Sequence, residues 1–408
     1  MPARLAGRCG GRVLFVAAIV SLFAAADWPQ FRGRTGSSLA PGSAPPVDFD
    51  VASGKNIAWK SPLPGRGASS PILVGDCVIV TASSGANQDR LHVLAFDATS
   101  GKRLWERQFW ATGRTLCHPT SSIAAPTPAS DGQRIFAFYS SNDLACLDLD
   151  GNLLWYRGLT YDYPTAANDV GMASSPLVVG DNVIVQVECL GESFAAAIDA
   201  ATGKTRWRVD RPKIMNWCSP TLLRSPKADK DVVLLQGPKG LVALDPADGR
   251  QLWSFDQEAS GIPSVVGTDG VLYVPSKGIT ALKPVAGGGT LETLWSSNKL
   301  EPASSSPVVL GDSIYCLNRA GALTAGDTAG GEVRWRLRLK GQFWATPVAA
   351  GDHLYCANSE GAIFAVKLGG EGQIDGESSL GEPVYGSPAV VDGALYVRSD
   401  AHLWKIAR

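Results

Sequence analysis

The chain has 408 residues, with 37 Lys plus Arg against 38 Asp plus Glu and a formal net charge of −1. That balance supplies no basic surface for phosphate backbones, so nucleic acid is excluded as an expected partner. The 45 glycines and 26 prolines are typical of a chain with many tight turns. Length alone allows two or three domains, but a repeat that continues to the C-terminus favours one.

Residues 1–26 have the layout of an export signal. Three arginines precede an apolar run over 13–23, and three alanines at 24–26 supply small residues for cleavage before Asp27. The run is too short to span a bilayer comfortably, and Cys9 precedes it instead of following it, which disfavours a retained or lipid anchor. We therefore expect a mature protein in the periplasm or outside the cell, with no transmembrane anchor.

Residues 27–56 are expected to form an irregular arm that packs on the folded domain. The stretch 34–55 contains three prolines and several Gly and Ser residues, which disfavours regular structure. Ahead of it, Trp28-Pro29-Gln30-Phe31-Arg32-Gly33 is too apolar for a free tail.

A repeat with a period near forty residues extends over 57–408. Eight times, a step of the Ser-Pro or Thr-Pro type opens a short hydrophobic stretch that alternates like a strand. The step prolines are Pro71, Pro128, Pro176, Pro220, Pro263, Pro307, Pro347 and Pro388. A period of about forty residues is that of a four-stranded propeller blade.

The second half of most units carries an Ala-aliphatic-Asp triplet, a turn glycine and a tryptophan. Asp accepts hydrogen bonds from turn amides, Gly adopts a positive φ, and Trp is expected to pack against the neighbouring blade. The repeat residues are Asp97, Trp105, Asp148, Trp155, Asp199, Trp207, Asp245, Trp253, Trp295, Asp327 and Trp335. In the last two units we place Lys367 and Lys405 at the Asp position, so the motif weakens toward the C-terminus.

The two ends of the repeat predict a closed ring. Only three residues follow Lys405, too few for an outer strand of an eighth blade, while Trp59 lies upstream of the first step with no blade of its own. We therefore predict an all-β, eight-bladed propeller of four-stranded antiparallel blades, in which an N-terminal strand around Trp59 completes the last blade. Such closure leaves no long exposed sheet edge.

Candidate binding residues lie on the loops of one face. In a propeller, the loops between blades and those between the second and third strands surround the mouth of the central channel. Here they are rich in aromatic and polar residues, which suits a flat ligand or a peptide segment, although the aromatic groups could instead only cap the ring. The candidates are Trp110, Arg114, His118, Tyr161, Tyr163, Asp169, Glu188, Asn216, Trp217, Arg319, Trp344 and Tyr385.

Catalytic signatures are weak by comparison. The four histidines show no metal-ligand spacing, so spacing predicts no metal site. Thr202-Gly203-Lys204-Thr205 imitates the end of a phosphate loop but belongs to a hairpin turn, and no Gly-x-Ser-x-Gly occurs. His118 is the one candidate for proton transfer, against the alternative that it only satisfies its own loop.

The units from Ala197 to Trp207 and from Ala243 to Trp253 resemble the PQQ-like propeller repeat. That repeat occurs in quinoprotein alcohol dehydrogenases and in BamB-type factors that assist outer-membrane protein assembly, and the resemblance covers about residues 57–408. It implies the fold and the compartment. The quinoproteins stack pyrroloquinoline quinone (PQQ) between a Trp and a disulfide of adjacent cysteines, beside calcium held by Glu, Asn and Asp. No two cysteines are adjacent here, and no motif assigns Glu188 or Asn216 to a calcium site.

Two functions follow from the sequence and the resemblance. We expect an exported, non-catalytic propeller that binds a protein partner or a small ligand through its aromatic loop face. The alternative is a PQQ-dependent oxidoreductase of the alcohol or sugar dehydrogenase type, with calcium and a simplified site. In that case Trp110, Trp217 or Trp344 would stack on the quinone.

Overall fold

The computed structural model describes residues 27–167, 169–224, 231–285 and 290–408. The predicted signal peptide over 1–26 lies outside these ranges. Within them the chain is almost entirely β-structure, with a single 3-10 helix, η1 (Leu159–Tyr161). The alternating apolar and β-branched stretches that follow each step account for this content, because such residues pack well on a pleated surface.

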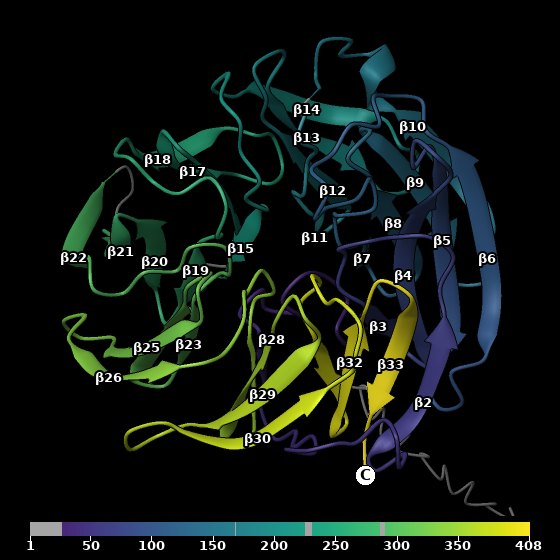
Figure 1. Cartoon of the computed structure of the whole chain (residues 1–408). Coiled ribbons are helices and arrows are strands. Elements are labelled where there is room, and N and C mark those ends of the chain that lie inside the picture. Colours follow the sequence, from purple (N-terminus) through teal and green to yellow (C-terminus); the bar gives the residue numbers. More distant parts are fainter. Residues whose placement is uncertain (1–26, 168, 225–230, 286–289) are drawn as a thin grey trace, which may run out of the picture.

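Eight sheets of four blade strands are arranged around a central axis, with the first strand of each blade innermost (Figure 1). The first four blades are β3 (Ile72–Val74), β4 (Cys77–Ser84), β5 (Arg90–Asp97), β6 (Arg103–Trp110); β7 (Ala129–Ser130), β8 (Arg134–Phe138), β9 (Asp143–Asp148), β10 (Leu153–Gly158); β11 (Leu177–Val179), β12 (Asn182–Val187), β13 (Phe194–Asp199), β14 (Thr205–Asp210); and β15 (Thr221–Leu223), β16 (Val232–Gly237), β17 (Gly240–Leu244), β18 (Gln251–Phe255).

The next three blades are β19 (Val266–Thr268), β20 (Val271–Ser276), β21 (Gly278–Pro284), β22 (Leu291–Ser297); β23 (Val308–Leu310), β24 (Ser313–Leu317), β25 (Ala322–Asp327), β26 (Val333–Arg338); and β27 (Val348–Ala350), β28 (His353–Ala357), β29 (Ala362–Lys367), β30 (Gln373–Ser379). The eighth blade combines β31 (Ala389–Val391), β32 (Ala394–Arg398) and β33 (His402–Ile406) with the N-terminal β2 (Ile57–Pro62).

The predicted closure is confirmed, and with it the predicted fold. Strand β2 pairs antiparallel with β33, and the C-terminus lies beside it in Figure 1. Trp59 lies opposite Lys405, just as Trp105 lies opposite Ala95 in the first blade. Lys405 therefore occupies the Ala position, and our placement of it at the Asp position was wrong by two residues. The eighth unit lacks the Ala-aliphatic-Asp triplet, so its sequence offered no marker for the register.

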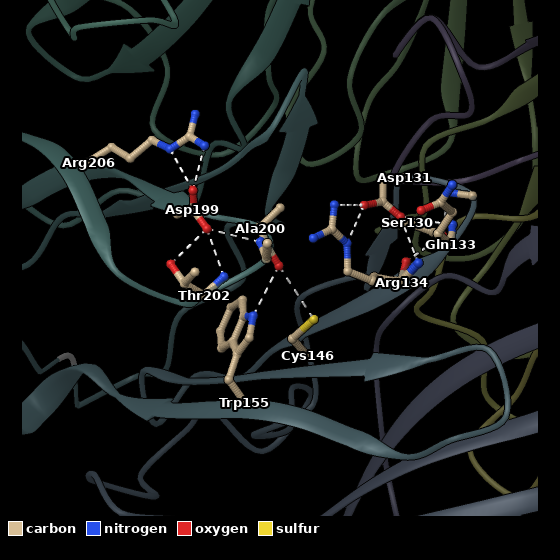
Figure 2. Close-up of polar contacts among 12 residues, drawn as sticks. Ser130, Asp131, Gln133, Arg134, Cys146, Trp155, Asp199, Ala200, Thr202 and Arg206 are labelled. Atoms are coloured by element: carbon tan, nitrogen blue, oxygen red, sulfur yellow. Dashed lines mark hydrogen bonds and ion pairs between the residues drawn. The ribbon is translucent and has the colours of Figure 1, made fainter.

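The repeat tryptophans join most blades to the next, and the seventh blade has Gly376 at the equivalent position. Trp155 Nε1–H donates to Ala200 O at 3.0 Å, and Cys146 Sγ points at the same carbonyl (Figure 2). The turn glycine of the neighbour completes the contact, because a Cβ on Gly203 would lie only 2.7 Å from Trp155 Cδ2. The equivalent indole bonds link Trp59 to Ala98 O, Trp105 to Leu149 O, Trp207 to Pro246 O and Trp295 to Thr328 O. Trp335 packs on Gly372, and Trp253 is buried.

The repeat aspartates fix the hairpin turns that receive these tryptophans. Asp199 Oδ1 accepts from the amide and hydroxyl of Thr202, each at 2.7 Å, and Oδ2 accepts from Arg206 Nε at 2.9 Å (Figure 2). These bonds favour the carboxylate and lower the pKa of Asp199 to about 2. Turn hydrogen bonds also lower the pKa of three further repeat aspartates, Asp97, Asp148 and Asp327. Asp245 accepts from Ala247 N in the same way.

Hydroxyl groups join the blades at their inner edge. From Ser70 to Thr346, the amide of the step residue in each of the first seven units donates to the hydroxyl of the next unit, with N–O distances of 2.9–3.1 Å. We name these residues the hydroxyl ring: Ser70, Thr127, Ser175, Ser219, Ser264, Ser306, Thr346 and Ser387. In the fifth unit the ring residue follows Pro263 instead of preceding a proline, so that step was placed two residues out of register with the others.

The arm over 27–56 crosses the central channel. Trp28 N donates to Leu73 O in the first blade at 3.1 Å, and Arg32 Nη1 donates to Val265 O beside the fifth at 3.1 Å. First and fifth blades face each other across an eight-bladed ring, so the segment spans the axis. Beyond it, β1 (Leu39–Ala40) pairs in parallel with β27 as a fifth strand of that sheet. Two residues are too short a strand for the sequence to predict.

The contact between Trp155 and Gly203 generates a stability prediction. Gly203→Ala places a methyl group against the indole and also strains a residue at φ +71°. Gly381→Ala is the matched control, because its φ is +69° and nothing lies within 4 Å of its ideal Cβ. The control should lose about 1–2 kcal/mol from backbone strain alone. In urea denaturation G203A should lose clearly more than G381A, and equal losses would show that the indole contact contributes nothing.

The aspartate turns generate a pH prediction. The pKa of Asp199 is about 2 in the folded chain, against about 3.9 for an ordinary aspartate in the unfolded one. The stabilisation is therefore fully present above about pH 4 and is lost as the pH falls toward 2. Asp199→Asn should flatten the decrease of the melting temperature between pH 5 and pH 2. An unchanged slope would contradict a stabilising role for this carboxylate.

Candidate functional site

A cavity of about 480 Å³ opens at the loop face on the axis of the ring. All eight residues of the hydroxyl ring line it. Trp217, Trp344, Tyr385 and Ile262 form its apolar walls together with neighbouring loop residues, and Phe31 of the arm lies against its lower end. Because the arm passes beneath the step residues, the channel becomes a blind cavity at this face.

Five predicted site residues come together here: His118, Trp217, Arg319, Trp344 and Tyr385. Trp217 Nε1–H donates to Gly171 O at 2.8 Å, so its indole is held in place. The Arg319 guanidinium lies over the Trp344 ring, 4.0 Å from its centroid, where the attraction between cation and ring holds the pair together. His118 Nδ1 lies 2.8 Å from Thr120 Oγ1, and its backbone pairs with Val170.

A second depression lies beside the central cavity, between the loops that follow β6 and β10. Three predicted residues, Arg114, Tyr161 and Asp169, line it, and Arg114 pairs with Asp169 at 2.5 Å. Tyr161 is 78% exposed and Leu190 71% exposed, so the depression has an apolar rim.

Trp110 and Tyr163 line neither hollow. Trp110 is 62% exposed at the end of β6, with the Arg90 guanidinium 4.4 Å from its ring centroid. Tyr163 packs on Phe194, with ring centroids 4.1 Å apart. The two Gln-Phe-Trp-Ala-Thr strings therefore occupy different places, because 108–112 ends an outer strand while 342–346 begins after β26 has ended.

Glu188 and Asn216 are buried between the third and fourth blades and line neither hollow. Glu188 Oε1 accepts from Arg211 Nε at 2.6 Å, and both side chains are nearly inaccessible. Asn216 Nδ2 donates to Gln236 O at 2.8 Å. A calcium ion is disfavoured here because the Arg211 guanidinium pairs with the Glu188 carboxylate and repels a second cation, while Glu188 Oε2 is buried with no hydrogen-bond partner among the described residues. In the ranges that the structure describes, no group of three or more His, Cys, Asp or Glu side chains is arranged to hold a metal.

Sequence reasoning missed the hydroxyl ring and Phe31 as parts of the cavity. The signal for the ring was present, because a hydroxyl residue adjoins the proline in all eight steps. We had used the step only to find the period of the repeat. Nothing in the sequence indicated that Phe31 would lie on the axis, since its position depends on contacts that the arm makes with opposite blades.

Comparisons with known proteins agree with this architecture. The sequence profile of the family described as outer membrane protein assembly factor BamB matches residues 46–192, 165–262, 191–290 and 279–375, which is more than half of the chain. The chain belongs to this family. A BamB protein of Burkholderia pseudomallei (strain K96243) is 24% identical to this chain over 249 residues. The match covers 59% of this chain and 59% of the Burkholderia protein.

Two solved structures share the fold. BamB from Moraxella catarrhalis has a TM-score of 0.63 and 20% identity, covering 85% of this chain and 96% of that one. A quinohemoprotein alcohol dehydrogenase from Comamonas testosteroni has a TM-score of 0.65 and 14% identity, covering 93% and 80%. At these identities the likeness shows the fold alone. Among the described residues of this BamB-family chain, no helix is long and apolar enough to cross a membrane.

The buried ion pair of Glu188 with Arg211 generates a prediction that distinguishes a structural role for Glu188 from a role as a calcium ligand. Glu188→Gln leaves the Arg211 charge buried and uncompensated, so unfolding free energy should fall by about 3–5 kcal/mol. Glu258→Gln removes the exposed partner of Lys277 and should change it by less than about 0.5 kcal/mol. Chemical denaturation measures both. A wild-type melting temperature that rose with calcium, and did so only with Glu188 present, would assign the site to the metal instead.

Proposed function

We propose that this protein is an exported, non-catalytic propeller that binds a partner protein through its loop face in the periplasm. Membership of the BamB family, the signal-like layout of residues 1–26 and the exposed apolar loops support this proposal. In this account residues 27–56 are the arm and 57–408 the propeller.

The observation that carries the proposal is a gathering of exposed apolar side chains on one face. They lie on the loops from the end of β6 to the start of β19, around the two hollows. They are Trp110, Leu116, Tyr161, Val170, Leu190, Met215 and Ile262. Soluble proteins rarely leave large apolar groups clustered in water, and such clusters mark interaction surfaces. Trp and Tyr are also the residues that most often dominate binding energy at protein interfaces.

The class of partner follows from the relatives. The matching family and the Burkholderia protein are described as outer membrane protein assembly factors. We propose that the partner of this chain is a protein engaged in assembling outer membrane proteins. The exposed loops of the first five blades form the contact, and the opposite ends of the blades remain free of it.

The alternative is the PQQ-dependent oxidoreductase. The fold shared with the quinohemoprotein alcohol dehydrogenase and the two tryptophans of the central cavity favour it. The pairing of Glu188 with Arg211 and the lack of adjacent cysteines in the sequence count against it. Titration of the mature protein with PQQ and calcium, followed by an alcohol oxidation assay with a dye acceptor, tests it. Saturable binding with dye reduction would replace the binding proposal.

The binding proposal makes its own prediction. A photo-crosslinking amino acid at Tyr161 should capture, in intact cells, an envelope protein engaged in outer-membrane assembly, identified by mass spectrometry. Adding Trp110→Ala should lower the yield about tenfold with little change in the melting temperature, because the Trp110 side chain is 62% exposed and stacks with Arg90 at the surface.

Leu153→Ala is the matched control, since Leu153 is an exposed apolar residue at the start of β10, away from the loop face. It should leave the yield unchanged. Equal losses in W110A and L153A, or a fall in melting temperature that matches the loss of yield, would restore the interpretation that the aromatic residues only support the fold.

A further inference from the structure

The polar lining of the central cavity consists of hydroxyl groups and two basic side chains. Twelve hydroxyl-bearing residues line it, together with one guanidinium from Arg319 and one imidazole from His118. None of the described residues on its wall carries a side-chain carboxylate or carboxamide. A cationic ligand would meet the positive charge of Arg319 and no carboxylate, although the hydroxyl groups could accept from its N–H groups. An anionic ligand would meet that charge together with hydroxyl groups that can donate to its oxygen atoms.

The hydroxyl ring has donor capacity to spare. Its members are at most 8% exposed, and from Thr127 to Ser387 each hydroxyl already accepts an amide of the preceding blade. An hydroxyl that accepts one hydrogen bond still has its own proton to donate. No described residue accepts a hydrogen bond from these hydroxyls, and all of them border the cavity. A buried donor without a partner costs free energy, so the ring favours an occupant with acceptor atoms.

Arg319 supplies the charge. Its guanidinium is stacked flat on Trp344, which holds it at the rim. It forms no ion pair with any described residue, whereas most arginines of the loop face, such as Arg114, have a carboxylate partner. The edge of a stacked guanidinium remains available for two parallel hydrogen bonds, the geometry that suits a carboxylate.

The remaining wall is apolar and the space is small. Trp217, Met215, Ile262 and Phe31 line it, and about 480 Å³ lies at the low end of the range for small-molecule sites. The cavity therefore accepts a compact group, not a strand or a helix. One positive charge beside neutral donors suits a single negative charge better than a dianion such as phosphate.

We propose that this cavity binds a carboxylate carried on a compact apolar or aromatic body. Arg319 and the hydroxyl ring hold the carboxylate and any further oxygen atoms, while Trp217 and Trp344 stack on the body. The site requires neither a metal nor a quinone. Two sources share this chemistry: a free aromatic acid, and the C-terminal carboxylate of a protein chain whose last residue is apolar. Binding of a free acid does not depend on the partner-binding proposal.

The test is calorimetric titration of the mature protein with matched pairs of probes. Phenylacetate should bind at least tenfold more tightly than phenylacetamide, and N-acetylphenylalanine at least tenfold more tightly than its amide, because only the acids meet Arg319 as anions. Arg319→Met should abolish this preference, and Arg319→Lys should retain part of it. Arg90→Met is the control, because Arg90 lies over Trp110 in the same way but outside the cavity, and it should leave acid binding unchanged.

A hexapeptide with an apolar last residue, prepared as free acid and as amide, separates the two sources. If the peptide acid binds more tightly than N-acetylphenylalanine, the site is assigned to chain termini. If the peptide acid does not bind while N-acetylphenylalanine does, the site is assigned to free acids. The proposal is overturned if acids and amides bind equally, if neither binds at millimolar concentration, or if R319M and R90M behave alike. Partner capture through Tyr161 with no acid binding would overturn this inference alone.

Discussion

Contact between one blade and the next is the interaction on which the whole structure depends. A four-stranded blade buries its faces only against its neighbours, and two devices recur at most junctions: an indole on the turn glycine of the next blade, and an amide that donates to the next step hydroxyl. Each junction is local, but the ring is complete only when the last junction forms. Trp59 supplies that last contact from the other end of the chain, through its bond to Ala98 O. The N-terminal strand is therefore a structural requirement of the fold.

The arm decides what kind of site the ring can offer. A propeller axis lined by short inner strands is open at both ends unless something fills it. Arg32 reaches the fourth and fifth blades while Trp28 is paired with the first, so the segment is held from opposite sides. The Arg32 guanidinium is buried, which lowers its pKa to about 10, and two acceptors on those blades offset part of that cost. The result is a cavity with a base, which can hold a ligand instead of passing it through.

The sequence predicted the parts of this molecule that repeat and failed where the chain departs from the repeat. Eight units, the outer position of Trp59 and the turn role of Asp199 all follow from local chemistry at regular spacing. The register of Lys405, the displaced step at Pro263 and the short β1 strand do not, because each lies where the motif is missing. The candidate site divides in the same way. The order of the loops predicted which face of the ring each candidate residue lies on, but not how deeply its side chain is buried. Glu188 and Trp110 lie at the same face, yet Glu188 is buried against Arg211 and Trp110 is 62% exposed.

Burial separates two populations of tryptophan that the sequence could not distinguish. Trp207, for example, is nearly inaccessible, and its indole N–H donates to the next blade. Its side chain therefore stabilises the fold and is not available to a ligand. Trp110 is mostly exposed and stacks with Arg90, and Trp344 stacks with Arg319, which has no carboxylate partner among the described residues. Fold stability does not explain why large apolar side chains that contribute little to it are exposed. A face on which such side chains cluster is therefore explained by binding to another molecule. The ring is stabilised by other contacts and holds these exposed side chains in fixed positions. Binding a partner would therefore lose little conformational entropy in the scaffold.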